Sequence, residues 1–178
     1  MTADARHALK AGTAAAHRAL EQVVGPLENR RDYIAYVQGL HAFRAPLEAV
    51  LDDAAFAPWR ATKLADVLHE DLLHLGVPPL APEPVPALDN RAAALGALYV
   101  LEGSTLGARI LLVQVQALGL DAQGGAKHLW RQSAALENWR AFLPLLESGD
   151  AADMDSVMAG ANAGFLAAER AMMRARNV

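Results

Sequence analysis

Apolar side chains recur every three or four residues along most of this chain, the spacing that gathers them on one face of a helix. The first such segment runs from residue 2 or 3 to residue 24, and the Gly25–Pro26 pair that follows is typical of a helix end. The face that it would bury carries Leu9, Thr13, Ala16, His17, Leu20 and Val24. The pattern therefore predicts an amphipathic helix with a histidine on its apolar side.

The same spacing predicts two more helices before the middle of the chain. One begins at residue 29 or 32 and continues to residue 51, with a kink or a break at Pro46. The next covers residues 61–75 and is stopped by Gly76. Residues 77–88 hold five of the nine prolines, so we expect an extended connection there.

A long helical pattern follows, which Asp89 or Asn90 can cap at its start. It continues through a stretch that contains two glycines and ends in a loop at residues 119–127. Two further helices are predicted at residues 128–147 and 150–176.

Composition supports an all-α fold. The chain has 178 residues, 53% of them hydrophobic and only 6% aromatic, and it is rich in Ala and Leu, which favour helices. This length suits one domain of ordinary size. We therefore expect a single helical domain over residues 1–178, without an internal repeat.

Charge and cysteine content exclude several classes of protein. The formal net charge of −4 opposes nucleic-acid binding, which needs a positive surface. The chain has no cysteine, so disulfides, thiol nucleophiles and Cys-ligated metals are excluded. Its longest uncharged apolar stretch, residues 92–101, is too short to span a bilayer, and its opening lacks a secretory pattern. We expect a cytoplasmic protein without a membrane partner.

One candidate site lies on the first helix. Glu21 follows His17 by one turn, so its carboxylate can approach a ring nitrogen and orient the other nitrogen toward a metal. The small side chains of Thr13, Ala14 and Ala16 leave room for something flat and broad. The alternative is a core histidine that a carboxylate satisfies.

A second candidate lies in the long helix, at Gly103 and Gly107. Two glycines inside a helix cost about 1 kcal/mol each relative to alanine, so something should offset the cost. They would bare a strip of backbone for a planar ligand, and they permit a kink near Ser104 and Thr105. The alternative is tight packing against another helix. Together the two segments favour heme, whose iron needs an axial histidine and whose flat ring needs room on both faces.

Both segments resemble heme oxygenases, most closely the bacterial branch associated with phytochromes that produces biliverdin. The first matches the pattern Leu-Lys-x-x-Thr-x-x-x-His-x-x-x-Glu at residues 9–21, and the second matches Tyr-Val-Leu-Glu-Gly-Ser-x-Leu-Gly at residues 99–107. Weaker similarity continues through residues 33–51, 71–76, 138–147 and 165–172. The resemblance implies a heme-oxygenase-like helical bundle with a kinked distal helix.

It also implies a role for each matching residue. His17 would be the iron ligand, Glu21 its hydrogen-bond partner, and Lys10 a cation beside a heme propionate, with Thr13 lining the site. Gly103, Ser104 and Gly107 would form the catalytic distal side. Phe165 would pack near the distal pocket, and Arg170 would be a further propionate partner.

The activity implied is oxidative cleavage of heme, both cofactor and substrate, to biliverdin, carbon monoxide and ferrous iron. O2 and an external electron donor such as a ferredoxin or a reductase would be needed, and a bacteriophytochrome could accept the biliverdin. Two departures keep a non-catalytic heme carrier or sensor open: Ser104 replaces the Asp of the mammalian-type pattern, and Ala108 replaces a second glycine of many relatives. A protein of the same fold that binds no heme is a further alternative.

Overall fold

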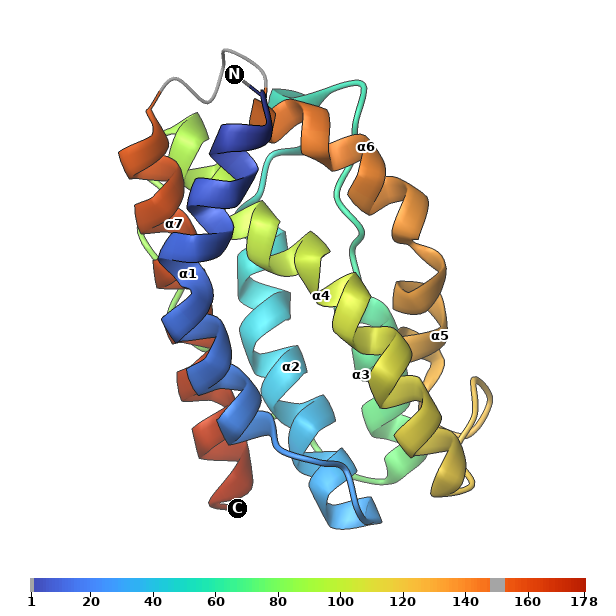
Figure 1. The fold of residues 1–178 in the computed structure, drawn as a ribbon. Helices are drawn as coiled ribbons and strands as arrows, with labels where there is room; N and C mark the ends of the chain where they lie inside the picture. Colours follow the sequence, from blue (N-terminus) through green and yellow to red (C-terminus); the bar gives the residue numbers. More distant parts are fainter. Residues whose placement is uncertain (1, 148–152) are drawn as a thin grey trace.

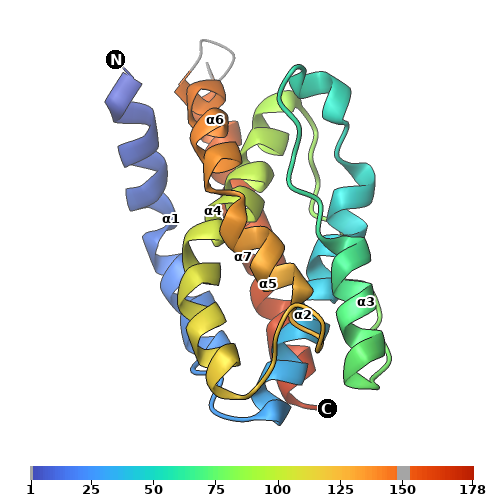
Figure 2. The ribbon, with the colours of Figure 1, turned by 90° about the vertical axis from the view of Figure 1, so that its right-hand side faces the viewer.

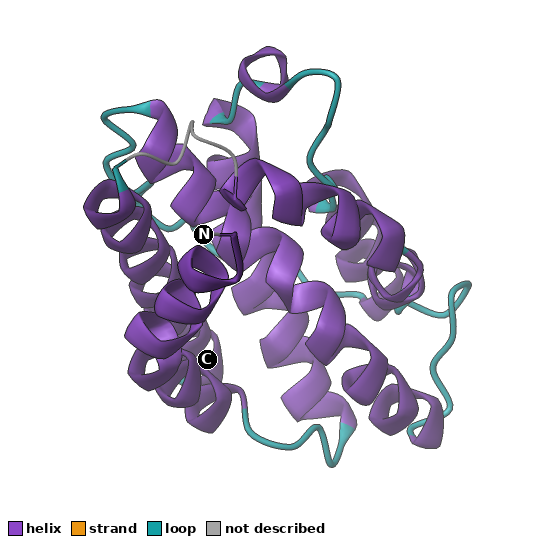
Figure 3. Cartoon of the chain, turned by 45° about the horizontal axis from the view of Figure 1, so that its top comes forward, coloured by secondary structure: helices purple, strands orange, loops and turns teal. Residues whose placement is uncertain are grey.

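The structure is a computed structural model that describes residues 2–147 and 153–178, with side chains described from residue 6 onward in these ranges. All the regular structure in these ranges is helical (Figure 3), which confirms the predicted all-α fold. The elements are α1 (Thr2–Val24), α2 (Arg30–Val50), η1 (Asp53–Phe56), α3 (Ala65–Leu75), α4 (Arg91–Ala117), α5 (Lys127–Ala134), α6 (Leu136–Glu147) and α7 (Met154–Arg176).

The ends of the helices follow local chemistry that the sequence displays. The side chain of Asn29 accepts a hydrogen bond from the N–H of Asp32 and begins α2, and Asn90 does the same for Ala93 at the start of α4. Gly76 ends α3 with φ at 74°, a left-handed conformation that glycine adopts without strain. These helix boundaries confirm the predictions.

Three predicted boundaries were wrong or fall outside the described residues. The third helix begins at Ala65 rather than at residue 61, because the N–H groups of Leu64 and Ala65 donate to the Glu48 carboxylate from α2. The expected helix over residues 128–147 is two helices, α5 and α6. The expected start of the last helix at residue 150 lies outside the described residues, whereas α2 passes through Pro46 unbroken.

The core is built around α4 and α7, which cross at their first halves (Figures 1 and 2). A Cβ added to Gly96 would lie 2.0 Å from the carbonyl oxygen of Val157, and one added to Gly160 would lie 2.1 Å from that of Ala93. The two backbones can approach so closely only because both positions are glycine. Around this crossing, α2 also packs on α7, and α3 packs on α2 and α5.

Helix α1 lies at one side of the bundle, where it packs on α7 and α6 (Figure 1). Helix α4 continues unbroken through both Gly103 and Gly107 and bends along its length (Figure 2). By length and composition alone α4 could cross a membrane, but 44% of its apolar window is buried inside the fold. Its packing on α7 fits the core helix of a soluble protein.

Candidate functional site

His17 of α1 presents its imidazole beside a carboxylate. Its Nδ1 lies 3.4 Å from Oε2 of Glu21, one turn along the same helix, and the two side chains are 55% and 65% exposed. The edge of the ring meets Phe165, with ring centroids 5.6 Å apart and planes at 80°. An N–H at Nδ1 that points to Glu21 leaves the Nε2 lone pair free to bind a metal.

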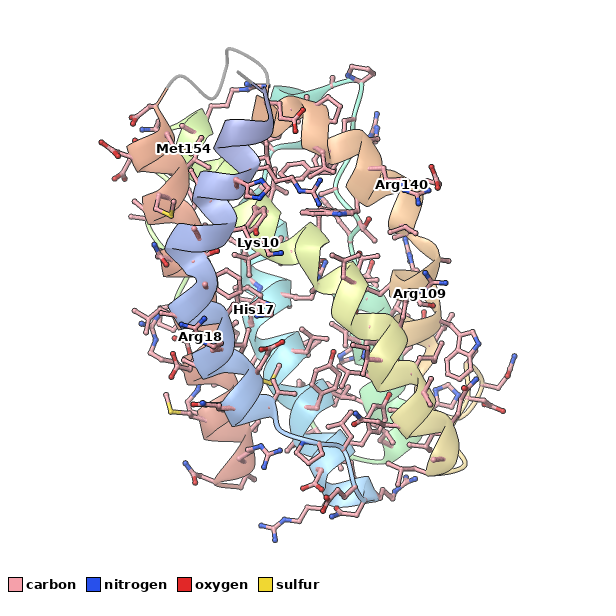
Figure 4. All side chains as sticks on the ribbon, viewed as in Figure 1. Lys10, His17, Arg18, Arg109, Arg140 and Met154 are labelled. Atoms are coloured by element: carbon pink, nitrogen blue, oxygen red, sulfur yellow. The ribbon has the colours of Figure 1, made fainter. Side chains whose placement is uncertain are left out.

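Lys10 lies two helical turns before His17, so the two side chains share one side of α1. Figure 4 places both on the side that faces α4. Thr13 lies between them, but its side chain is buried and its hydroxyl donates to the Leu9 carbonyl at 2.7 Å. The hydroxyl of Thr13 is therefore already used within α1.

Gly103 and Gly107 are open, unlike the glycines at the helix crossing. A Cβ added to Gly107 would meet no atom within 4 Å, and one added to Gly103 would meet only the indole of Trp139, at 3.8 Å. Tight helix packing, the alternative that the sequence left open, does not explain these two glycines. They leave the backbone of α4 bare.

Three aliphatic side chains extend this bare region along α4. Leu106, Ile110 and Val113 are 50%, 66% and 66% exposed, and their spacing puts them on one side of the helix with Gly103 and Gly107. We call these five residues the bare face of α4. Sequence reasoning found the glycines and missed the aliphatic residues, although their spacing of four and three residues was a visible signal.

The bare face is directed toward α1. Gln114, which follows Ile110 by one turn on the same side of α4, accepts a hydrogen bond at 2.9 Å from the N–H of Leu27, just after α1. Helices α1 and α4 thus border one region (Figure 1), and His17 lies on the side of α1 that faces α4 (Figure 4). An exposed apolar surface that meets an exposed imidazole suits a large apolar ligand that carries a metal.

Any metal bound at this site would have to be carried by such a ligand. Among the described residues, no group of three or more His, Asp and Glu side chains is arranged to hold a metal ion. A single histidine holds a metal well only when another group fills the remaining positions, as the porphyrin of heme does. The open glycines and the lone imidazole therefore fit heme.

Behind the bare face, Ser104 is tied into a buried polar network. Its hydroxyl donates to the Leu101 carbonyl at 2.5 Å and accepts hydrogen bonds from Nε2 of Gln132 and, at 3.5 Å, from Nη1 of Arg44. Arg44 is only 1% exposed, and its Nε donates to Glu48 at 2.6 Å. The sequence did not indicate Arg44 or Gln132, because both are distant from Ser104 along the chain.

Glu102, next to Gly103, is buried on the far side of this network. Its carboxylate accepts hydrogen bonds from the N–H of Thr62 at 2.6 Å and from Asn138 at 3.2 Å. Burial raises the pKa of Glu102, although these donors and the nearby Arg44 act in the opposite direction. The residues on either side of Gly103 are thus held by groups from α2, α5, α6 and the segment before α3.

Arg170 is not brought together with His17. Its Nε donates to Glu83 at 2.6 Å, and Arg174 pairs with the other oxygen of the same carboxylate at 2.9 Å. Glu83 lies in the proline-rich connection that follows α3. Arg170 follows Phe165 by five residues, which places it about 140° further round α7, so a propionate contact would require the guanidinium to leave Glu83.

A second pairing of histidine with a carboxylate lies in the core, where the sequence did not indicate one. His128 is fully buried, and its Nδ1 lies 2.8 Å from Oδ2 of Asp71. The same carboxylate accepts the N–H groups of Lys127 and His128, so Asp71 of α3 caps the start of α5. Burial lowers the pKa of His128. This pair is part of the scaffold that holds α5.

Comparison with known proteins finds relatives among the heme oxygenases. The chain is 33% identical over 141 residues to the heme oxygenase PigA of Pseudomonas aeruginosa, covering 74% of this chain and 71% of PigA. It is 34% identical over 113 residues to a heme oxygenase of Xanthomonas campestris, covering 60% of this chain and 66% of that protein. No family model matches the chain.

The fold of the chain is similar to that of a solved heme oxygenase. The structure of the NO- and CO-bound enzyme from Neisseria meningitidis superposes with a TM-score of 0.78 at 26% sequence identity, covering 98% of this chain and 92% of that one. The likeness therefore includes the whole bundle rather than one pair of helices.

Proposed function

The chain belongs to the heme oxygenase family, and from this premise we propose that it binds heme between α1 and the bare face of α4 and degrades it. The products are biliverdin, carbon monoxide and ferrous iron. The observation that carries the site assignment is the pairing of an exposed imidazole, His17, with two glycines on which a Cβ would meet almost nothing.

On α1, three side chains would hold the heme. Nε2 of His17 would bind the iron, while the Glu21 carboxylate accepts the N–H at Nδ1 and keeps the imidazole in the required tautomer. The ammonium group of Lys10, on the same side of the helix, would pair with a propionate. Phe165 of α7 lies against the His17 ring and limits its rotation.

On α4, Gly103 and Gly107 would let the macrocycle approach the helix backbone, and the aliphatic residues of the bare face would exclude water from its surroundings. Trp139 of α6 stands beside Gly103 and closes that end of the site. Bound heme supplies the iron that activates O2 and the porphyrin ring that is opened. The residues around it set the orientation and the access of water.

Further partners complete the proposal. Heme degradation consumes electrons, which we assign to an external donor such as a ferredoxin or a reductase in the cytoplasm. A bacteriophytochrome could accept the biliverdin. The second candidate function, a heme carrier or sensor without turnover, is favoured by one observation: the hydroxyl of Ser104 is already engaged by three protein groups.

The test is a hemin titration of the wild-type protein and of the His17→Ala variant, read by the Soret band. We expect the wild type to develop a Soret band that His17→Ala alters or loses. His74→Ala is the matched control, because His74 is exposed on α3 and its Nδ1 contacts only the Glu70 carbonyl of its own helix. Its spectrum should equal that of the wild type.

A reductant added in air then separates the two functions. Decay of the wild-type Soret band into biliverdin absorbance, with carbon monoxide release, is the result expected of a heme oxygenase. A stable Soret band without bilin would indicate the carrier instead. Absence of a Soret band in the wild type would overturn both.

A further inference from the structure

The hydrogen-bonding capacity of the Ser104 hydroxyl is fully used. A serine hydroxyl has one donor and two acceptor positions. Here it donates to the Leu101 carbonyl at 2.5 Å and accepts from Gln132 and Arg44. A water molecule or a ligand would have to displace one of these groups, of which Arg44, at 3.5 Å, is the most distant. The role of Ser104 in the site must therefore be sought in what it connects.

Ser104 connects the back of α4 to two other helices. On the helix it lies about 100° round from Gly103 and about 60° from Gly107, and its hydroxyl meets Arg44 of α2 and Gln132 of α5. The Leu101 carbonyl beneath it accepts from both Ser104 and Nη1 of Arg44. Side-chain donors at a helical carbonyl bend a helix at that point, which is where α4 passes Gly103.

Gln132 is held in the core, as is Arg44, whose guanidinium also bonds Glu48, Leu101 and Thr62. Gln132 is 2% exposed and lies one turn after His128 on α5. That turn is fixed by the Asp71 carboxylate, which accepts the N–H of His128 at 2.9 Å and contacts its ring. The amide of Gln132 thus reaches Ser104 from a helix whose start is clamped in the core.

Gln132 also has an unsatisfied atom, which suggests a role other than stability. Its Oε1 is buried and has no hydrogen-bond partner in the described part of the chain. A buried acceptor without a donor destabilises a fold. A methionine or leucine would fill the same space without this penalty, so packing alone does not account for a glutamine here.

We propose that Gln132 is a positioning residue for heme degradation: by donating to the Ser104 hydroxyl, it braces α4 from behind and fixes how Gly103 and Gly107 are presented to the heme. Ser104 then acts as the link in this brace rather than as the holder of a catalytic water. The inference rests on the proposed function, because it concerns the same heme site.

A double-mutant cycle tests the brace. Gln132→Met keeps the side-chain volume and removes the amide, Ser104→Ala removes the hydroxyl, and the third protein carries both changes. Each is titrated with hemin, and the ferric Soret maximum and the ratio of biliverdin isomers are measured. We expect each single change to weaken hemin binding about threefold or more and to shift the isomer ratio, and the double variant to be no worse than either one.

Gln116→Met is the matched control, because Gln116 is exposed on α4. It should leave the hemin affinity, the Soret maximum and the isomer ratio unchanged. A purely structural role for Gln132 would lower the thermal stability of the apoprotein and leave the Soret maximum and the isomer ratio unchanged, which would overturn the proposal.

Two further results would also overturn it. In the first, Gln132→Met has the spectrum and isomer ratio of the wild type while Ser104→Ala is defective. In the second, the loss of hemin affinity in the double variant equals the sum of the losses in the two single variants. Failure of the proposed function looks different, because the wild-type protein itself would then give no Soret band or no bilin.

Discussion

The two halves of α4 use glycine for opposite purposes. In the first half, Gly96 lies against α7, where a Cβ would come within 2.0 Å of the Val157 carbonyl oxygen. In the second half, a Cβ added to Gly107 would meet no described atom within 4 Å. Gly96 is required because the backbone of α7 occupies the space beside it, whereas the space beside Gly107 is filled by none of the described residues.

The difference between Gly96 and Gly107 shows how the cost of a glycine inside a helix can be interpreted. Glycine in a helix interior is about 1 kcal/mol less favourable than alanine wherever it occurs. At Gly96 the close packing of α4 on α7 offsets that cost within the protein. At Gly107 no packing within the described residues offsets it, which agrees with the proposal that a ligand lies there.

The largest expected effect is on the stability of the apoprotein. It is measured by comparing Gly96→Ala with Gly107→Ala. The methyl group at residue 96 would force α4 and α7 apart, so we expect a loss of about 3 kcal/mol or more, a fall in Tm of roughly 10 °C. The same change at residue 107 meets no atom and should raise Tm by about 2–4 °C through helix propensity. Thermal melts followed by circular dichroism measure both.

Equal effects at the two positions would remove the distinction between the halves. In particular, a large loss in Gly107→Ala would mean that the second half of α4 is packed in solution. Helical content before melting should be recorded for both variants, since Gly96→Ala can also lower the yield of folded protein.

The next effect is on heme binding, through Gly107→Leu. The added side chain projects from the bare face, where a macrocycle would lie, so we expect hemin affinity to fall by about tenfold or more, which is about 1.4 kcal/mol. The apoprotein should keep its Tm, because the side chain enters open space. Soret titration measures the affinity. Gln116→Leu is the control, because it adds the same side chain at an exposed position elsewhere on the same helix.

Unchanged hemin affinity in Gly107→Leu would separate the bare face from the heme site. The site would then have to be sought elsewhere around His17. A simultaneous fall in Tm and in affinity would leave the comparison between the halves without support.

The sequence was sufficient for those parts of the site that arise within one helix. The pairing of His17 with Glu21 follows from a four-residue spacing, and the openness of the Gly103 region was one of two alternatives that spacing allowed. The capping residues Asn29 and Asn90 were equally visible, since a cap bonds within its own turn. Each of these contacts spans four residues or fewer.

The remainder depends on tertiary contacts that no local pattern encodes. Arg44 reaches Ser104 across 60 residues, Gln132 reaches it across 28, and Arg170 pairs with Glu83 across 87. A guanidinium that is buried in the core and one that is bound on the surface look alike in a sequence. For this reason the brace behind α4 was missed, and the expectation of a propionate contact at Arg170 stays a prediction.

The smallest expected effect concerns α5, the helix that supports the second half of α4. It is measured as the pH dependence of the free energy of unfolding. Burial lowers the pKa of His128 below its ordinary 6.5, and Arg44 acts in the same direction, while Asp71 opposes both. Below about pH 6.5 the unfolded chain therefore binds a proton that the folded protein refuses. As the pH drops from 7 toward 5, the contribution of His128 to the free energy of unfolding therefore falls, with a limiting slope of about 1.4 kcal/mol per pH unit.

His128→Asn removes that titration while keeping a polar side chain beside Asp71. The variant should be less stable than the wild type at pH 7, but it should lose less stability between pH 7 and pH 5 in urea unfolding. The lowered pKa of His41 contributes equally in both proteins and cancels in the difference. The same pH dependence in both would show that the start of α5 opens to water, and the second half of α4 would then lack a fixed support.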